Sequence, residues 1–375
     1  MILSTPPVTH EFDETQVDSA VAACPNVPAV FLVWPREGSP YLARTTLLHR
    51  RLMRLLAPRG HASRLLYLRP VARRIEYWIC GSRLESSLLL YSLARRYFPQ
   101  DYARILKLRQ SSYVKLILSN PFPRTQVTTR LSGADSLHYG PFSSRAAAEN
   151  FENGFLDFFQ LRRCQEDLQP SSDHPGCVYG EMNKCLRPCQ RIVSVEEYAS
   201  EAGRVAGFLR SDGVTLLDSL RAARDRWSEE LEFEEAARMH KRLEKAAAIL
   251  QLRGELATDI QRLCGVAVTP AADGDAVGLW FLLDGAWRHG HSLSLRVEEG
   301  RPIPLDRRLK ELAAAIPPVP RAPLRERQDH LSLLAAWFYS SWRDGEWVPF
   351  SEPAAIPYRK LVNAIHRVAR SRSTT

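Results

Sequence analysis

The sequence predicts a multidomain α/β (α+β) protein, and three observations support that fold class. Its 375 residues are enough for roughly two to four domains. Over the first hundred residues, short apolar runs typical of buried strands alternate with amphipathic stretches typical of helices. After residue 257 the pattern changes to strands separated by Asp-Gly turns, which predicts an antiparallel meander.

Composition places the chain among ordinary globular proteins, with 45% hydrophobic and 25% charged residues. The first residues carry neither a positive region nor an apolar one, so we expect no signal peptide. No run of about 18 apolar residues occurs, so we expect no membrane-spanning helix and a cytoplasmic location. The net charge of +9 suits a polyanionic partner such as DNA.

The first domain is expected to span residues 26–103, after a loose lead-in over residues 1–25 with one short helix. Its pattern switches repeatedly between the strand period and the helix period. In chain order we expect a strand at 29–34, a turn, a return strand at 41–43, a helix with a leucine stripe at 48–56, a strand at 75–79, and a helix at 82–97 that opens with a capping box.

Arginines are concentrated in one part of this domain. From Gly38 to Ile75 there is no acidic residue, and a solvated basic face and a phosphate-binding face both fit this pattern. We favour phosphate binding, because an uncompensated positive run is electrostatically costly, and we expect Arg44, Arg50 and Arg54 to contact DNA. The nine arginines are Arg44, Arg50, Arg51, Arg54, Arg59, Arg64, Arg69, Arg73 and Arg74.

A second domain is expected over residues 104–200. We expect two strands between residues 113 and 132, a turn at Gly140-Pro141, and a helix capped by Ser143. That helix carries four phenylalanines on one face, which is more typical of a buried core than of a base-stacking platform. They are Phe151, Phe155, Phe158 and Phe159.

Four of the seven cysteines lie within residues 161–193, here called the cysteine segment: Cys164, Cys177, Cys185 and Cys189. The segment has few apolar residues, so burial alone cannot fold it, and metal binding would supply the missing free energy. The spacing is not that of a zinc ribbon. A metal or iron–sulfur site, which we favour, unpaired structural thiols and disulfides all remain open. The other cysteines are expected to be small buried residues.

The remaining chain divides into a helical hairpin, an α/β region and a basic tail. The hairpin, within residues 201–257, is too small to bury its own apolar face, so it would bind a partner or pack on this chain's own core. The later elements are expected as strands at 265–269, 276–283 and 288–295, and helices at 305–316 and 331–342 within residues 258–350, followed by a helix at 358–372 within the tail, 351–375.

Several short motifs follow one another in a fixed order. Ala29-Val30-Phe31 and Tyr41-Leu42-Ala43 are followed by a basic helix, a leucine-rich helix at 85–99, Tyr139-Gly140-Pro141-Phe142 and the four cysteines. This series resembles the UvrC family of bacterial excinucleases, whose N-terminal nuclease is of the GIY-YIG type. The resemblance is good over residues 20–255 and weaker to about residue 350, where only the opening of the family's RNase H-like domain is matched.

The resemblance implies a metal-dependent nuclease site with several departures from the family pattern. In the family, two tyrosines, an arginine and a metal-binding glutamate share the chemistry. Tyr41 and Arg51 match, but Phe31 replaces the first tyrosine and Leu90 stands at the glutamate. Leucine cannot bind Mg²⁺, which prefers oxygen ligands, and Glu76 is the alternative carboxylate. Two further departures are Ala43 and Ala103.

The resemblance also implies an iron–sulfur cluster at the four cysteines, with zinc as the alternative, and Mg²⁺ only if the nuclease is active. A UvrB-like partner would bind the hairpin through Phe233, Glu235, Ala236 and Arg238. We therefore expect a DNA-binding protein of nucleotide excision repair with an impaired nuclease. Two alternatives stay open: an active endonuclease making a single incision, and an iron–sulfur protein that binds DNA in response to redox changes.

Overall fold

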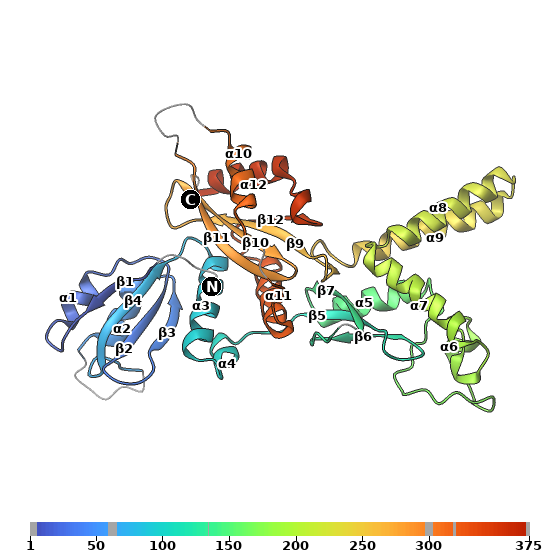
Figure 1. Ribbon diagram of the computed structural model, residues 1–375, viewed down its shortest axis with the longest axis horizontal. Helices are drawn as coiled ribbons and strands as arrows, with labels where there is room; N and C mark the ends of the chain where they lie inside the picture. Colours follow the sequence, from blue (N-terminus) through green and yellow to red (C-terminus); the bar gives the residue numbers. More distant parts are fainter. Residues whose placement is uncertain (1–5, 59–65, 134, 297–302, 318–319, 373–375) are drawn as a thin grey trace. The chain divides into compact units, whose positions relative to one another are not determined.

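The computed structural model describes residues 6–58, 66–133, 135–296, 303–317 and 320–372. The described chain is mixed α/β with three antiparallel sheets of four strands each, which confirms the predicted fold class (Figure 1). It divides into two compact units, one formed by 1–108, 264–320 and 336–375 and the other by 109–263 and 321–335. No helix in the described part of the chain is long and apolar enough to cross a membrane.

The first sheet belongs to the N-terminal domain and has the strand order β1-β4-β2-β3. The expected strands and helices are present, but the expected loose lead-in is wrong, because β1 pairs with β4 along its whole length. The elements are β1 (Val8–Glu11), α1 (Val17–Ala22), β2 (Ala29–Pro35), β3 (Tyr41–Thr45), α2 (Leu48–Leu56), β4 (Ala72–Ile79), α3 (Arg83–Tyr97) and α4 (Tyr102–Leu106).

Side-chain alternation gives this sheet two buried faces. Phe31 on β2 and Tyr77 on β4 belong to the core formed with α1 and α2, and Tyr41 packs against the same core. Leu32 and Glu76, which are paired neighbours on β2 and β4, point to the other face. Helix α3 covers that second face, where it contacts β2 and β3.

The second sheet carries the middle domain, with strand order β6-β5-β7-β8. The expected turn at Gly140-Pro141 is wrong: both residues lie inside β7, joined by a cis peptide bond. The next helix, α5, is capped by Ser144 instead of Ser143. The elements are β5 (Ser112–Ile117), β6 (Arg124–Thr128), β7 (Ser136–Phe142), α5 (Arg145–Leu156), α7 (Val195–Arg210) and β8 (Thr258–Asp259).

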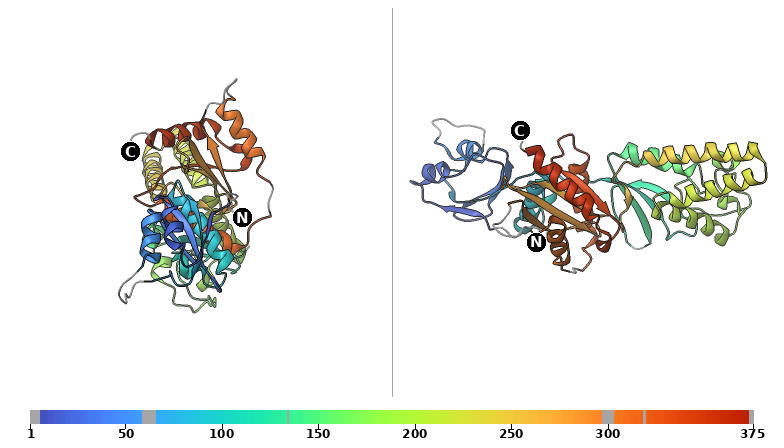
Figure 2. Two further views of the ribbon diagram at one scale, coloured as in Figure 1. Left: turned by 90° about the vertical axis from the view of Figure 1, so that its left-hand side faces the viewer. Right: turned by 90° about the horizontal axis from the view of Figure 1, so that it is seen from above.

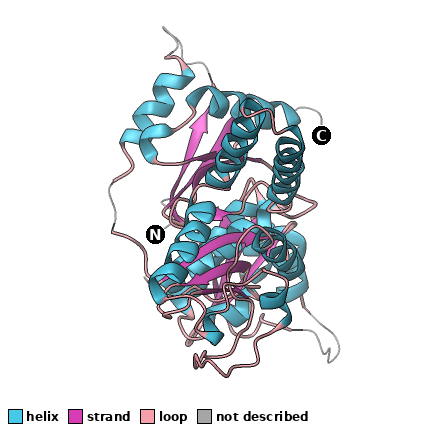
Figure 3. Cartoon of the chain, turned by 90° about the vertical axis from the view of Figure 1, so that its right-hand side faces the viewer, coloured by secondary structure: helices cyan, strands magenta, loops and turns pink. Residues whose placement is uncertain are grey.

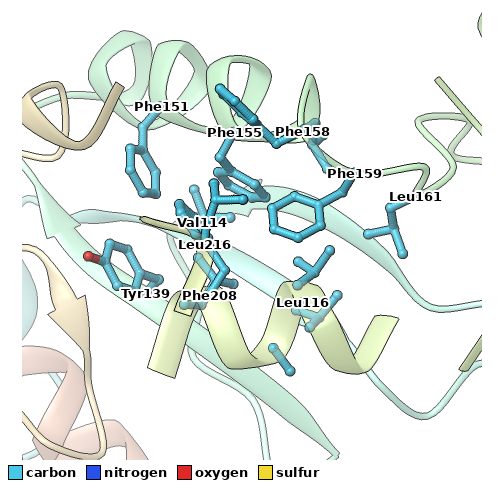
Figure 4. Close-up of a cluster of buried hydrophobic side chains, with 14 of the residues drawn as sticks. Val114, Leu116, Tyr139, Phe151, Phe155, Phe158, Phe159, Leu161, Phe208 and Leu216 are labelled. Atoms are coloured by element: carbon cyan, nitrogen blue, oxygen red, sulfur yellow. The ribbon is translucent and has the colours of Figure 1, made fainter. Parts of the chain in front are cut away.

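The four phenylalanines expected in a core are all buried in it. The rings of Phe155 and Phe159 lie 5.2 and 5.6 Å from the ring of Phe208 on α7, and Phe151 stacks on Tyr139 of β7. Figure 4 shows these rings meeting between α5 and α7. This phenylalanine core fixes the end of α5, after which the cysteine segment begins.

Two antiparallel helices form the expected hairpin, α8 (Val214–Glu229) and α9 (Phe233–Gln251). Near its base, Leu216, Leu220, Ala246 and Ile249 are buried in the phenylalanine core. The tip projects away from the middle-domain sheet (Figures 1 and 2). The hairpin is therefore held at one end only.

The third sheet is the predicted meander, with order β11-β10-β9-β12, although β12 was not expected. Helix α11 begins seven residues before its expected start at 331. The apolar pattern did not predict its first half, because that half carries the buried polar residues Arg327, Asp329 and His330. The elements are β9 (Cys264–Pro270), β10 (Ala276–Leu283), β11 (Ala286–Ser294), α10 (Leu305–Ala314), α11 (Leu324–Phe338), β12 (Glu346–Phe350) and α12 (Tyr358–Arg372). Residues 318 and 319, between α10 and α11, lie outside the described residues.

His138 on β7 makes the stability of the middle domain depend on pH. Its ring is 1% exposed, and Nε2 accepts a hydrogen bond from the Ser132 amide at 3.3 Å. Burial, followed by the charges of Lys115 and Arg327, lowers the pKa of His138 to about 4. Below its ordinary pKa of 6.5 the unfolded chain takes up this proton first, so stability is lost as pH falls from 6.5 towards 4.

We predict that His138→Gln reduces the loss of unfolding free energy between pH 7 and pH 4 by up to about 3 kcal/mol. Urea unfolding followed by circular dichroism at several pH values measures this slope. The control is His240→Gln, the same replacement at a histidine whose side chain is 55% exposed. A His138→Gln protein with the wild-type slope would contradict the buried neutral ring.

Candidate nucleic-acid interface and cysteine site

Tyr41 and Arg51 meet at the β3 edge of the first sheet. Arg51 Nη2 donates a hydrogen bond to Tyr41 Oη at 3.0 Å, and the ring of Phe31 lies 6.1 Å from that of Tyr41. Leu90 is half-buried on α3, which covers the opposite face of the sheet. The structure thus brings Phe31, Tyr41 and Arg51 together, and the hydrocarbon side chain of Leu90 lies on the helix that covers the other face.

The carboxylates of Glu76 on β4 and Glu85 on α3 are both engaged in other contacts. Glu76 Oε2 accepts from Trp34 Nε1 at 2.8 Å, and its Oε1 lies 3.4 Å from Arg74 Nε, on the face opposite Tyr41. Glu85 Oε2 accepts from the Gly81 amide at 2.7 Å, and burial raises the pKa of this carboxyl. Both carboxylates therefore serve the fold at the α3 side of the sheet.

The arginine run is partly neutralised, which corrects the expectation that it is uncompensated. Three of its members pair with carboxylates from the N-terminal residues that form β1 and α1. The pairs are Arg69 with Asp18 at 2.6 Å, Arg73 with Glu14 at 2.5 Å, and Arg74 with Glu11 at 3.8 Å. Sequence reasoning missed these pairs because the partners lie more than fifty residues away.

The three arginines expected to contact DNA do not share one surface. Arg50 and Arg54 are exposed on α2, one helical turn apart. Arg44 lies on the α3 side of the sheet, where Nη1 donates to Ser87 Oγ at 2.8 Å. Arg59 and Arg64 lie outside the described residues. A phosphate-binding face would therefore centre on α2.

The cysteine segment is mostly loop, with one short helix, α6 (Val178–Glu181), and a single 3₁₀ turn at Pro188–Gln190 (Figure 3). Backbone hydrogen bonds tie its parts together: Leu186 N donates to Gln160 O at 3.0 Å, and Ser171 N donates to Cys189 O at 2.9 Å. Gly176 has a φ of 78°, and a Cβ at this position would lie only 2.8 Å from Nε2 of the Gln190 side chain, so the close approach requires glycine. The fold of the segment thus draws its two ends together.

The four thiols lie close enough to influence one another. Burial and the neighbouring Cys164, Cys177 and Cys189 thiols raise the pKa of Cys185 to about 11, although the hydrogen bond from the Arg187 amide acts in the opposite direction and lowers it. Two N–H groups donate to sulfur: the Arg187 amide to Cys185 Sγ at 3.4 Å, and Arg162 Nη1 to Cys164 Sγ at 3.6 Å. Hydrogen bonds to sulfur are typical of thiolates that ligate metal clusters.

The placement of the thiols tests which group the segment fits. Among the described residues, no three His, Cys, Asp or Glu side chains are placed to hold a single metal ion. A cluster separates its thiolates more than one ion does, because its own atoms lie between them. Four free thiols with N–H donors to two of the sulfur atoms are a donor set of the kind that holds a thiolate-bound cluster. The remaining cysteines, Cys24, Cys80 and Cys264, are buried as expected.

The hairpin tip exposes two large apolar side chains, Leu231 at 71% and Phe233 at 65%. Leu231 also has a left-handed backbone, with φ at 63°, which leucine rarely adopts. Glu235 pairs with Arg238 beside them. Leu231 was not among the expected partner residues, although its position between Glu230 and Glu232 in the turn was a readable signal.

Comparison with known proteins identifies the middle domain. Residues 112–208 match the family model of the UvrC/Cho excinuclease middle domain, which covers β5 to α7 and the whole cysteine segment. The UvrABC system protein C of Lachnospira eligens is 23% identical over 74% of this chain, and that of Thermoanaerobacter sp. strain X514 is 21% identical over 94%. The matched middle domain and these relatives support a UvrC-family protein.

The relatives are considerably longer than this chain. The alignment covers 46% of the Lachnospira eligens protein, 58% of the Thermoanaerobacter protein and 38% of a Pseudomonas syringae protein that is 27% identical. The chain thus spans about half the length of the curated relatives it matches. No solved structure matches it.

Proposed function

We propose that this chain is a DNA-binding protein of nucleotide excision repair whose nuclease-like domain has lost catalysis. The observation that carries the proposal is Leu90, a hydrocarbon side chain at the position where the family binds its metal. The fold of the domain is kept, because the leucine stripe and the Ser82 cap specify α3 without that carboxylate.

Catalysis of phosphodiester hydrolysis needs an activated water and charge stabilisation, and a divalent metal normally supplies both. Tyr41 and Arg51 supply a phenol and a cation, which can orient a phosphate but cannot generate hydroxide at neutral pH. Glu76, the alternative carboxylate, is bonded to Trp34 on the other face of the sheet. These contacts support a protein that binds DNA but does not cleave it.

Two other functions have one observation each in their favour. An active endonuclease making a single incision is favoured by the retained hydrogen bond between Arg51 and Tyr41. A redox-responsive DNA-binding protein is favoured by the gathered thiols. A response of DNA affinity to cluster oxidation would distinguish this function from repair.

We propose further that Cys164, Cys177, Cys185 and Cys189 hold an iron–sulfur cluster, with zinc as the alternative. A cluster would supply the cross-link that a loop segment with little apolar surface lacks. In this role the four thiolates bind, and the Arg187 amide orients Cys185 through its hydrogen bond to sulfur.

The relatives are named as components of a UvrABC system, and we propose a UvrB-like partner for this chain. The hairpin tip is the surface that supports this proposal. Leu231 and Phe233 are exposed in a hairpin held only at its base, and exposed apolar pairs of this kind are typical of protein contacts.

The nuclease proposal predicts DNA binding without cleavage by Mg²⁺ or Mn²⁺. Plasmid nicking by the purified protein, with and without UvrA and UvrB, measures this. Leu90→Glu alone should restore little, because Phe31 and Ala103 still depart from the family pattern, and the triple variant with Phe31→Tyr and Ala103→Asn has the best chance of activity. Nicking by the unmodified protein that Arg51→Ala abolishes would show that the nuclease is active.

The α2 surface predicts a steep dependence of DNA affinity on salt. Replacing Arg50 and Arg54 by alanine should reduce the slope of log affinity against log salt by about two ionic contacts. Arg73→Ala is a matched control, because Arg73 already pairs with Glu14 and should change the slope little. Fluorescence anisotropy at several salt concentrations gives the slopes, and a wild-type slope near zero would refute the phosphate-binding surface.

The hairpin tip predicts that Leu231→Ser with Phe233→Ser weakens binding of a UvrB-like protein by roughly 10- to 100-fold, the range typical of central apolar contacts. Thermal stability should hardly change, since both side chains are exposed. Calorimetric titration measures the affinity, and Arg221→Ala, an exposed change elsewhere on the hairpin, serves as the control. Unaltered affinity in the double variant would exclude the tip as the contact.

A further inference from the structure

Arg162 is the most deeply buried cation of the middle domain, with 1% of its surface exposed. Its Nε donates to Phe122 O at 2.9 Å, and its Nη1 donates to Cys164 O at 3.2 Å and to Glu166 O at 2.9 Å. Nη1 also lies 3.6 Å from Cys164 Sγ. The guanidinium is thus fixed by neutral carbonyl groups at the start of the cysteine segment.

This buried charge has no carboxylate partner among the described residues. Its Nη2 is buried and makes no hydrogen bond. The next residue, Arg163, shows the ordinary arrangement: it pairs with Asp157 at 2.9 Å and lies over the ring of Tyr179. A guanidinium that is removed from water without a counter-charge is strongly unfavourable, so the site of Arg162 calls for negative charge nearby.

The groups that can supply this charge are the thiols of the cysteine segment. Cys164 contacts the guanidinium directly, and Tyr198, whose hydroxyl accepts a hydrogen bond from the Arg162 amide, lies close to Cys185. Four thiolates around iron carry net negative charge, and each electron added to the cluster makes that charge one unit more negative. A fixed cation beside the ligands therefore favours the reduced form.

We propose that Arg162 is the charge-compensating residue of the cysteine site and that it raises the reduction potential of the bound cluster. This inference rests on the proposed iron–sulfur site. The reaction concerned is addition of one electron to the oxidised cluster, and a dithionite-driven titration with redox mediators supplies the electron. No sequence signal separates Arg162 from Arg163, and only burial and pairing distinguish them.

The test compares Arg162→Gln, Arg162→Lys and Arg163→Gln in the full chain, purified without air. Iron content and the midpoint potential from optical redox titration are measured for each. Arg162→Gln should lower the ratio of reduced to oxidised cluster at a fixed potential about tenfold, a shift of about 59 mV for a one-electron couple. Arg162→Lys keeps the charge and should stay within that limit. The control Arg163→Gln should also stay within it, because Asp157 already neutralises the charge of Arg163.

The outcomes separate this inference from the cluster proposal. Arg162→Gln with full iron and an unchanged potential would overturn the role of Arg162 while leaving the cluster intact. A wild-type protein that holds no iron would instead refute the cluster. If Arg162→Gln does not fold, Arg162→Lys is the deciding variant. Full iron content with a near wild-type midpoint potential supports the inference. A fall of more than tenfold in the ratio of reduced to oxidised cluster contradicts it.

Discussion

The cysteine segment depends on the phenylalanine core, because it contains little apolar surface of its own. Tyr198 of α7 joins the two, since its hydroxyl donates to Pro123 O at 3.0 Å and accepts from the Arg162 amide at 2.8 Å. On the same helix, Glu201 Oε1 accepts from the Gln160 amide at 2.6 Å. The chain therefore enters the segment at a fixed position, two residues before Cys164.

The fold of the N-terminal domain does not depend on nuclease chemistry, which is what the proposed loss of catalysis requires. Its stability comes from two buried sheet faces, and neither face needs the polar groups that a nuclease would use. A leucine at position 90 is compatible with a helix that is half-buried there. The carboxylates that remain nearby have structural roles, with Glu76 bonded to Trp34 and Glu85 to the start of α3. Substitutions at such a site change activity before they change folding.

Local periodicity was enough to predict most elements, including the leucine stripe of α2 and the phenylalanine face of α5. Where prediction failed, the deciding interactions are long-range. Gly140-Pro141 reads locally as a turn, but β7 continues through it because its neighbours on both sides pair with it. The first half of α11 was not predicted, because it carries buried polar residues such as His330 in place of an apolar stripe. The charge of the arginine run could not be judged without the ion pairs from the N-terminal residues.

The candidate sites divide in the same way. The four cysteines and the Tyr41–Arg51 pair were readable because their residue types are rare or arranged in motifs. The sequence did not show that Arg44 lies on a different face from Arg50, because that depends on side-chain alternation along β3. It also did not show that Arg162 is more deeply buried than Arg163, because burial depends on the tertiary fold. The hairpin tip was partly predictable. The sequence shows Leu231 as an apolar residue between two glutamates, but its exposure and left-handed backbone are seen only in the structure.

The central claim is that four thiolates bind a cluster that completes the fold of the middle domain. Quantifying iron, acid-labile sulfide and zinc per chain after purification without air tests it most directly. We predict iron and sulfide together, with the broad visible absorbance of thiolate-bound iron, and loss of both in Cys185→Ser. A colourless protein with one zinc per chain and no sulfide would contradict the cluster while leaving a metal site in place.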